Sequence, residues 1–446
     1  MKRVSATETV KYLKKEVGVC GWVNRRRDHG GVVFLDLRDR SGILQVVCSS
    51  KLAKDIKEED VLAINGKVRK RPPEMINPNL ETGKIELEAS RIEVLTKAES
   101  LPFDLKTQEL KVSLPTLLDF RPITLRHPKS KAIFRVQEEI IDSFRKNMKD
   151  LDFFEFQAPT IVPVATEGGA EVFPVKYFDY TAYLAQSPQL YKQILVGVFE
   201  KVFTVTKAYR AEPSVTTRHL CEYISLDMEM GFIDSWEDLM DICQILIYNI
   251  LSDVKENCKE ELKMFGQEVS GLGEPVPRLK LREAQQIIFE RTRRDNRKEP
   301  DLTPEDEKEI CQWAKEKKKT DLVFITHFPA KKRPFYTYPD PEDPEYTLSF
   351  DLLYRGIEIV TGGQRIHEYE KLVKNITKFG LKKKNLEFYL QAFKYGMPPE
   401  GGFALGAERI TKQILGLENL REASFFPRDM GRIDQRLTTL KTKRKK

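Results

Sequence analysis

The fold is decided by the stretch Tyr209–Glu229, YRAEPSVTTRHLCEYISLDME, in which arginine and carboxylate side chains accompany two β-rich runs. An arginine inside a strand is costly to bury unless a carboxylate pairs with it. Segments 351–365 and 401–409 carry the same mixture of Arg and acidic residues. A single cluster of this kind is best explained by a structural ion pair. Three together favour a polyphosphate site, in which arginines bind phosphates and acids hold Mg²⁺.

The glycine-rich phosphate loops of many nucleotide-binding proteins are missing from the sequence. It contains neither G-x-x-x-x-G-K-[ST] nor a G-x-G-x-x-G that follows a strand. A nucleotide would therefore have to be held in another way, by the charged side chains themselves.

The first hundred residues have the pattern of a small β-barrel. Gly, Asp, Asn and Pro turns separate five β-rich runs, which favours short antiparallel strands. The runs are Val17–Val23, Val32–Leu37, Ile43–Val47, Val61–Val68 and Ile85–Val94. Five strands in this length predict a barrel of the oligonucleotide-binding (OB) kind, with a generic small barrel or sandwich as the alternative.

Residues 24–31, NRRRDHGG, are predicted to be the loop between the first two of these strands. Cations for phosphates, an aromatic ring for stacking and an amide for a base edge form a set suited to single-stranded RNA. The candidates for this set are Arg25, Arg26, His29, Phe34 and Gln45. Taken alone, Phe34 is better explained as a core residue.

The remaining chain is expected to form one large α+β domain. Residues 101–127 are predicted to be a linker, because prolines interrupt a stretch of little periodicity. From 128 to 436 amphipathic helices alternate with β-rich segments, beginning with an apolar stripe from Ile133 to Met148. We therefore predict domains at 1–100 and 128–436, followed by a disordered basic tail at 437–446.

Composition and charge exclude several classes of protein. Lys and Arg number 75 against 68 Asp and Glu, a net charge of +7. No apolar run approaches the ~20 residues of a membrane helix, and the first residues lack the apolar core of a signal peptide. The six cysteines form no C-x2-C pair, which argues against structural zinc and disulfides and favours a reducing, cytoplasmic location.

Together these motifs resemble those of the class II aminoacyl-tRNA synthetases, and specifically the aspartyl-tRNA synthetase family. The resemblance extends from about Val17 to Asp429. Three segments resemble the class motifs: the helix leading to Pro159 resembles motif 1, residues 210–229 resemble motif 2, and residues 401–409 resemble motif 3. Two further strings are the aspartate-type signatures, Gln186–Gln193 (QSPQLYKQ) and Gly362–Arg365 (GGQR).

The resemblance implies a two-domain architecture. An N-terminal five-stranded OB-fold barrel would bind the tRNA anticodon, and a catalytic domain would consist of an antiparallel sheet flanked by helices. Only 130 positions separate Asp227 from Glu358, too few for the large insertion domain of most bacterial members, which implies the compact archaeal or eukaryotic type. A homodimer through the motif 1 helix and the strand at Pro159 is also implied.

For the amino acid, the resemblance implies that Lys192 and Arg365 bind the side-chain carboxylate of aspartate. Asparagine would leave both buried cations poorly paired, which accounts physically for its rejection. The residues implied around the α-ammonium group are Glu167, Ser187, Gln189 and Asp227.

For ATP, the resemblance places Arg210 on the α-phosphate and Arg218, His219 and Arg409 along the phosphates. It also places Tyr223 and Arg409 on the two faces of adenine. The full implied ATP-binding set is Arg210, Glu212, Arg218, His219, Leu220, Tyr223, Glu358, Gly406 and Arg409. The implied catalytic residues are Arg210, Glu358 and Arg409. The implied Mg²⁺ ligands are Glu358, Thr361 and Asp351. Three positions depart from the usual family residues: Thr361 stands for Ser, Tyr223 for Phe or Trp, and Glu400 where related sequences often have His.

The implied reaction is ATP-dependent attachment of aspartate to tRNA(Asp) through aspartyl-adenylate. Asparaginyl-tRNA synthetase is the nearest alternative, and Lys192 within the Gln186–Gln193 string argues against it. A non-catalytic RNA-binding paralogue is a second alternative, which the presence of Arg210, Glu358 and Arg409 argues against. His29 leaves open whether the enzyme also attaches aspartate to tRNA(Asn), because bacterial relatives of relaxed specificity tend to carry His at this position. The alternative is that His29 is an ordinary turn residue.

Overall fold

The computed structural model describes residues 3–164, 171–213 and 216–437. The chain divides into two compact units, Met1–Leu110 and Lys111–Lys446, and each has a hydrophobic core of its own. The predicted ammonium ligand Glu167 lies outside the described residues, as does the predicted tail beyond Leu437.

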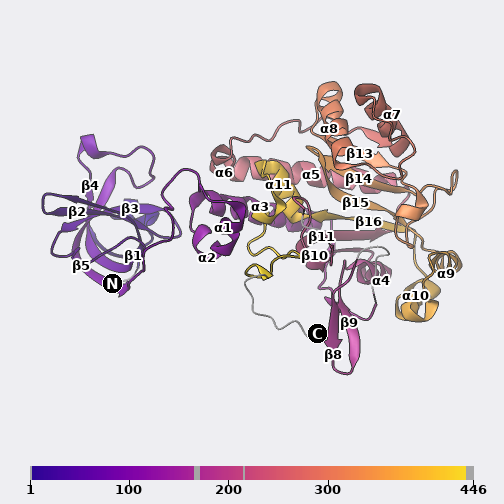
Figure 1. Ribbon diagram of the computed structural model, residues 1–446, viewed down its shortest axis with the longest axis horizontal. Helices are drawn as coiled ribbons and strands as arrows, with labels where there is room; N and C mark the ends of the chain where they lie inside the picture. The colour runs from indigo at the N-terminus through magenta and orange to yellow at the C-terminus, as the bar shows by residue number, and fades with distance from the viewer. Residues whose placement is uncertain (1–2, 165–170, 214–215, 438–446) are drawn as a thin grey trace. The chain divides into compact units, whose positions relative to one another are not determined.

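The first unit is a closed five-stranded barrel with the strand order β1-β2-β3-β5-β4 (Figure 1). Its strands are β1 (Glu16–His29), β2 (Val32–Arg38), β3 (Ile43–Ser49), β4 (Val61–Lys70) and β5 (Ile85–Thr96), and its 3-10 helices are η1 (Thr7–Tyr12) and η2 (Pro73–Met75). Alternate side chains such as Val33, Leu35 and Leu37 fill the barrel. The predicted OB-type barrel is confirmed, with all five runs as strands.

The prediction that residues 24–31 form a loop is wrong. β1 continues to His29 and pairs with β2 as far as His29 opposite Val32. Gly30 and Gly31 have φ values of 54° and 96°, the left-handed values that a two-residue hairpin turn requires. Because two glycines suffice for the turn, the basic side chains before them lie on a strand.

The second unit is built on an eight-stranded sheet with the order β12-β13-β14-β15-β16-β11-β10-β6. The strands are β6 (Phe154–Glu155), β10 (Lys201–Tyr209), β11 (Glu222–Gly231), β12 (Arg278–Lys280), β13 (Leu322–Thr326), β14 (Ser349–Tyr354), β15 (Ile357–Arg365) and β16 (Glu400–Gly406). The central pairs are antiparallel, as predicted, but the outermost pairs β12–β13 and β6–β10 are parallel. A separate small sheet contains β7 (Ile161–Val162), β9 (Tyr180–Leu184) and β8 (Pro174–Tyr177).

Helices cover both faces of the large sheet. One core joins α3, α5 and α11 to the sheet, and a second joins α4, α9 and α10 to it. The helices are α1 (Leu114–Asp119), α2 (Arg121–Thr124), α3 (Pro128–Asp150), α4 (Gln189–Phe199), α5 (Glu237–Asn257), α6 (Lys259–Met264), α7 (Leu281–Thr292), α8 (Pro304–Lys318), α9 (Tyr369–Lys378), α10 (Glu387–Lys394) and α11 (Ala407–Leu415), with 3-10 turns η3 (Ala330–Lys332), η4 (Lys383–Leu386) and η5 (Leu420–Ala423). Among the described residues, no helix is both long and apolar enough to cross a bilayer.

The stretch 101–127, expected to be a linker, contains two short helices in its second half. Ser113 caps α1, and Pro115 and Pro122 lie in the first turns of α1 and α2. Proline is favourable there, because the first helical N–H groups have no partner within the helix. The prolines therefore begin helices at these positions.

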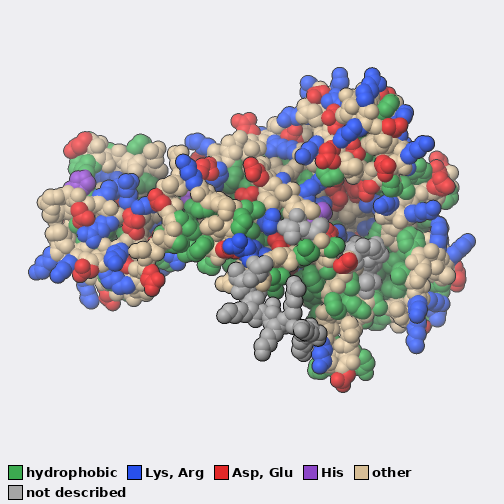
Figure 2. All heavy atoms as spheres, in the orientation of Figure 1, with side chains coloured by type: hydrophobic (Ala, Val, Ile, Leu, Met, Phe, Trp, Pro, Cys, Tyr) green, Lys and Arg blue, Asp and Glu red, His purple; other side chains and the backbone are tan. Residues whose placement is uncertain are grey.

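On strand β11, the alternation of side chains places a row of polar residues on one face of the large sheet. On β11, Leu226 and Met228 belong to the core beneath α3 and α5. Side chains at alternating positions point to opposite faces, so Ser225, Asp227 and Glu229 lie on the other face. Figure 2 shows that charged side chains of both signs are mixed over the visible surface, so the net charge does not form one patch there.

Candidate active site

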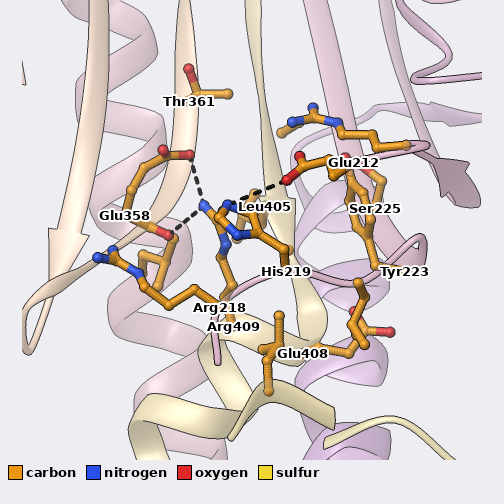
Figure 3. Close-up of a pocket in the computed structure, with 16 residues that line it drawn as sticks. Glu212, Arg218, His219, Tyr223, Ser225, Glu358, Thr361, Leu405, Glu408 and Arg409 are labelled. Atoms are coloured by element: carbon orange, nitrogen blue, oxygen red, sulfur yellow. Dashed lines mark hydrogen bonds and ion pairs between the residues drawn. The ribbon is translucent and has the colours of Figure 1, made fainter. Parts of the chain in front are cut away.

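One pocket of the second unit, of about 130 Å³, collects charged side chains from three separate segments (Figure 3). They come from β11 and the loop before it, from β15, and from the junction of β16 with α11. Its lining includes all nine residues of the predicted ATP-binding set, which are Arg210, Glu212, Arg218, His219, Leu220, Tyr223, Glu358, Gly406 and Arg409. We call this pocket the arginine pocket.

Two arginines of the arginine pocket are paired with acids. Arg409 Nη1 lies 3.2 Å from Glu358 Oε1 and donates to the Glu358 carbonyl oxygen at 3.0 Å. Arg218 donates to the carboxylate of Glu307, which comes from the first turn of α8. Burial raises the pKa of Glu307 to about 7, against the effect of Arg218. A polyanionic ligand would compete with these acids for the two guanidinium groups.

His219 lies between hydrogen-bonding and charged neighbours. Its Nδ1 is 2.7 Å from Thr216 Oγ1, and its Nε2 is 3.6 Å from Glu212 Oε2. Burial lowers the pKa of His219, Glu212 opposes this shift, and the surrounding arginines add to it. The imidazole is therefore suited to hydrogen bonding as a neutral ring.

Tyr223 has an arginine over its ring. The guanidinium carbon of Arg210 lies 5.5 Å from the ring centre. The predicted partner of Tyr223 across an adenine ring is Arg409, whose guanidinium pairs with Glu358 in the structure. A flat aromatic ligand on Tyr223 would thus lie close to Arg210, and contact with Arg409 would require that guanidinium to turn from Glu358.

A second group of charges lies beside the arginine pocket and is buried. Lys192 Nζ lies 3.1 Å from Asp227 Oδ1 and 3.0 Å from Glu229 Oε2, and Arg365 Nε donates to Glu229 Oε1 at 2.7 Å. The side chains of Lys192 and Asp227 are each 1% exposed. Ser225 lines the arginine pocket and donates to Asp227 Oδ2, which joins the two groups. We call Lys192, Asp227, Glu229 and Arg365 the ion-pair cluster.

Helix α4 packs over the sheet and supports the ion-pair cluster. Ser187 Oγ accepts from the Gln189 N–H at 3.3 Å at the start of α4. Gln189 Nε2 donates to Gln193 Oε1 at 3.0 Å, and Gln193 Nε2 donates to Glu400 Oε1 at 2.7 Å. The predicted residues Gln189, Lys192, Asp227 and Arg365 are thus brought together, with Ser187 at the beginning of the helix.

Gly402 permits the close approach of strands that the cluster needs. A Cβ at this position would lie 2.2 Å from the Met228 carbonyl oxygen and 2.3 Å from Glu229 Oε2. Arg365 Nη2 donates to the Gly402 carbonyl oxygen at 2.9 Å. Any side chain at this position would therefore displace Glu229, the carboxylate that binds both cations.

The predicted metal ligands lie on the neighbouring strands β14 and β15. Glu358 and Thr361 line the arginine pocket, whereas Asp351 is buried and pairs with Arg333 at 2.8 Å. Burial raises the pKa of Asp351 to about 6; Arg333 opposes this shift and Glu358 adds to it. Asp351 Oδ1 has no hydrogen-bond partner. No group of three or more His, Cys, Asp or Glu ligands occurs among the described residues, so a cation here would also need oxygens from a ligand.

In the first unit, the candidate RNA-binding residues lie around the β1–β2 hairpin. The rings of His29 and Phe34 are in edge contact at 5.8 Å, and Arg26 pairs with Asp28 at 3.0 Å. Arg25 is exposed. Gln45 is buried, donates to Glu86 at 2.8 Å and accepts from Arg27 at 3.3 Å.

Several site residues received no role in the sequence analysis, among them four that bind the side chains of predicted site residues. They are Glu229, Glu307, Arg333 and Ser225. Glu229 and Ser225 alternate with Asp227 on one strand, a period-two signal that could have placed them on its face. Glu307 and Arg333 come from distant segments, and no local pattern marks them.

Comparison with known proteins agrees with this geometry. Residues 113–430 match the family model of class II tRNA synthetases (D, K and N), and residues 17–95 match that of an OB-fold nucleic acid binding domain. The chain is 42% identical to the aspartate--tRNA(Asp/Asn) ligase of Deinococcus radiodurans, with 97% of this chain and 99% of the relative covered. It is 40% identical to the aspartate--tRNA(Asp) ligase of Pyrococcus abyssi, with 94% and 96% covered.

Among solved structures, the chain is similar to asparaginyl-tRNA synthetase from Pyrococcus horikoshii in complex with asparaginyl-adenylate. The TM-score is 0.88 at 31% identity, with 97% of this chain and 99% of that one covered. Sequence and fold thus define a class II aminoacyl-tRNA synthetase with an OB-fold domain, a class of enzymes that use ATP. Within that class, the chain belongs to the aspartate--tRNA ligase family.

Proposed function

We propose that this enzyme activates L-aspartate with ATP and transfers it to tRNA(Asp). The observation that carries the proposal is the pair of buried cations, Lys192 and Arg365, in the ion-pair cluster beside the arginine pocket. A substrate carboxylate can share both cations, whereas a side-chain amide cannot match them. The names of relatives at about 40% identity support aspartate as the amino acid.

The proposed chemistry requires no nucleophile from the protein. The α-carboxylate of aspartate attacks the α-phosphate of ATP, pyrophosphate leaves, and a terminal tRNA ribose hydroxyl then takes the aspartyl group from the adenylate. Arg210 and Arg409 would bind phosphate oxygens, and their charges would stabilise the transition state. Cys221 takes no part, because burial raises the pKa of its thiol.

The oxygen ligands of Glu358 and Thr361 fit Mg²⁺ at the arginine pocket, with Asp351 behind them. Asp351 has a buried carboxylate oxygen without a hydrogen-bond partner, and burial and the nearby Glu358 raise its pKa. A hard cation bound here would pair with that oxygen and stabilise the ionised acid. When bound, Mg²⁺ would neutralise phosphate charge. Arg333 orients these ligands by pairing with Asp351 and donating to Thr361 Oγ1 at 3.0 Å.

We assign tRNA recognition to the barrel of residues 1–100, with Phe34 as a stacking ring and Arg25 and Arg26 as phosphate contacts. Gln45 would read a base edge after release from Glu86. The test is aminoacylation of tRNA(Asp) transcript with labelled aspartate. Aspartylation that falls when the anticodon is altered is expected; equal charging of all anticodons would contradict the assignment.

A second substrate, tRNA(Asn), is favoured by one observation. His29 is in edge contact with the proposed stacking ring Phe34, and the relative from Deinococcus radiodurans is named for both tRNAs. Aspartylation of tRNA(Asn) transcript within about tenfold of the rate for tRNA(Asp) is expected. No aspartylation of tRNA(Asn) would reject this extension.

We further propose that the enzyme is a cytoplasmic homodimer. Phe154 and Phe199, 49% and 43% exposed, stack at 4.1 Å, and Val198 next to them is 65% exposed; apolar patches of this kind mark protein interfaces. Light scattering should give twice the chain mass of 51.7 kDa, and Phe199→Glu should give the monomer mass. All six cysteines are free thiols, as expected in a reducing compartment, and cell fractionation would test the location.

A further inference from the structure

Glu400, the first residue of β16, is a completely buried acid with one polar partner. Its side chain is 0% exposed. Oε1 accepts the hydrogen bond from Gln193 Nε2, while Oε2 has no hydrogen-bond partner. Within the described parts of the chain, Glu400 forms no ion pair, although it directly adjoins the ion-pair cluster through Gln193 and through its register with Arg365.

The charged groups that the described residues bring close to Glu400 are paired with one another. Lys192 and Gln193 face it from α4, Glu229 from β11, Arg365 from β15 and Tyr389 from α10. Lys192 is bound by Asp227 and Glu229, and Arg365 by Glu229. Two cations are therefore already balanced by two carboxylates, and a third ionised acid would be an uncompensated buried charge.

A buried carboxyl group without a cation takes up a proton, because ionisation away from water and counter-charges is very costly. The electrostatics agree with the geometry. Burial and the charge of Glu229 raise the pKa of Glu400 well above its ordinary value. For Glu229, burial acts in the same direction, but Arg365 and Lys192 outweigh it and lower its pKa.

We propose that Glu400 is a specificity-determining residue of the amino-acid pocket and works as a neutral carboxylic acid. This inference rests on the proposed activation of aspartate. In the proposed reaction the α-carboxylate of either amino acid faces ATP at the arginine pocket, outside the ion-pair cluster. To the cluster, whose charges are already balanced, aspartate then adds a side-chain carboxylate and an ammonium group, so the balance is kept. Asparagine adds only the ammonium group to the cluster and leaves an excess positive charge there. An ionised Glu400 would reverse this preference.

Glu400 acts through the groups it touches. As a neutral acid, it accepts the hydrogen bond of Gln193, whose Oε1 accepts from Gln189 and from the Tyr389 hydroxyl at 3.1 Å. Gln189 is one of the residues proposed around the ammonium group. Glu400 therefore positions the α4 amides while leaving both cations to the substrate carboxylate.

The first test needs no activity and asks whether Glu400 carries a proton. Melting temperatures of wild type, Glu400→Gln and the exposed control Glu387→Gln are measured from pH 5 to pH 9. An acid whose pKa is raised in the folded state makes the wild type lose stability as pH rises, whereas the amide of Glu400→Gln has no proton to lose in this range. The melting temperature of Glu400→Gln, taken relative to that of wild type, should therefore increase as pH rises. A constant difference overturns the proposal.

The second test is ATP–pyrophosphate exchange with aspartate or asparagine. Glu400→Ala is expected to raise KM for aspartate about tenfold at similar kcat and to lower the preference for aspartate over asparagine by a similar factor. Glu400→Gln, the isostere of the neutral acid, should restore both values to within about threefold of wild type. The proposal is overturned if Gln is as damaging as Ala, or if Ala is without effect. Absence of aspartate-dependent exchange in the wild type would instead reject the proposed function, leaving the melting test to decide the protonation of Glu400.

Discussion

The two halves of the active site handle charge in opposite ways. In the ion-pair cluster, the side chains of Lys192 and Glu229 are 1% and 0% exposed. In the arginine pocket, those of Arg409 and Glu358 are 24% and 33% exposed. Buried charges must be matched one for one, because an unpaired charge there is costly. Charges that reach water are screened, and their pairs exchange at little cost.

This difference assigns separate tasks to the two halves. The ion-pair cluster can select an amino acid, because a ligand of the wrong charge leaves a buried cation or acid unmatched. The arginine pocket can admit a polyphosphate, since Arg409 and Glu358 reach water and Arg409 can exchange the carboxylate for a phosphate at little cost. Selectivity should therefore depend on the cluster and turnover on the pocket.

The largest effect is expected from Arg365→Met. It removes one of two cations and leaves Glu229 with Lys192 alone, a loss of about 3–5 kcal/mol for a broken buried pair. Aspartate-dependent exchange should fall at least about 1,000-fold. Arg297→Met, which removes an exposed cation paired with Asp295, is the matched control and should retain activity. A loss of less than about tenfold in Arg365→Met would show that the cluster does not select the substrate.

A smaller effect is expected from Arg409→Lys in the arginine pocket. Lysine keeps the charge but loses the planar fork that binds two oxygens at once. Exchange should show kcat reduced about 100-fold with KM for aspartate unchanged. If KM for aspartate rises as much as kcat falls, the two halves are not separate in function.

The barrel extends the comparison to a third region, whose surface is open to solvent. Phe34→Ala should raise KM for tRNA(Asp) about tenfold, because stacking of one base contributes about 1–3 kcal/mol. ATP–pyrophosphate exchange without tRNA should be unaffected. Val32→Ala on the same strand, where Val32 is 41% exposed, is the control. Impaired exchange in Phe34→Ala would argue that the ring stabilises the fold.

The smallest effect concerns Glu307, the acid that pairs with Arg218. With its pKa raised to about 7, this carboxyl is largely neutral at pH 6 and ionised at pH 8, where it competes with phosphate for Arg218. From pH 6 to pH 8, KM for ATP should rise about threefold more in wild type than in Glu307→Gln. Ionisation of ATP itself affects both proteins equally. Equal pH profiles would mean that Glu307 does not face the phosphates.

The same raised pKa has a consequence for stability with a definite sign. The contribution of Glu307 is complete below its ordinary pKa of 4.5 and is lost as pH rises through about 7. The melting temperature of Glu307→Gln, taken relative to that of wild type, should therefore increase from pH 5 to pH 8. Glu305→Gln, on the same turn of α8, should show no such trend.

Elements with a local signal could be predicted from the sequence. The barrel strands, the α3 stripe and the strand with Asp227 each follow a period of two or 3.6. Arg210, Glu358 and Arg409 could be grouped because each lies in a segment that mixes arginine with acids, although Arg210 follows the end of β10 and Arg409 lies on α11. The extension of β1 to His29 was missed, since residues 24–31 have the composition of a loop and only pairing with β2 makes most of them a strand.

Long-range pairs were not predictable in the same way. Arg218 with Glu307 and Asp351 with Arg333 join segments that are separated in the sequence, and nothing in either segment indicates the other. That Glu400 lacks a cation becomes visible only when both cations of the ion-pair cluster are seen to be bound by other acids. Such features depend on the tertiary fold and on a count of buried charges.

Selection of aspartate by the ion-pair cluster is tested most directly by one measurement. ATP–pyrophosphate exchange by the full-length wild type is compared with aspartate and with asparagine as the amino acid. A kcat/KM for aspartate at least about 1,000-fold above that for asparagine is predicted, in the range reached when a wrong ligand leaves buried polar groups unpaired. Exchange with asparagine at an equal or higher rate would contradict the account.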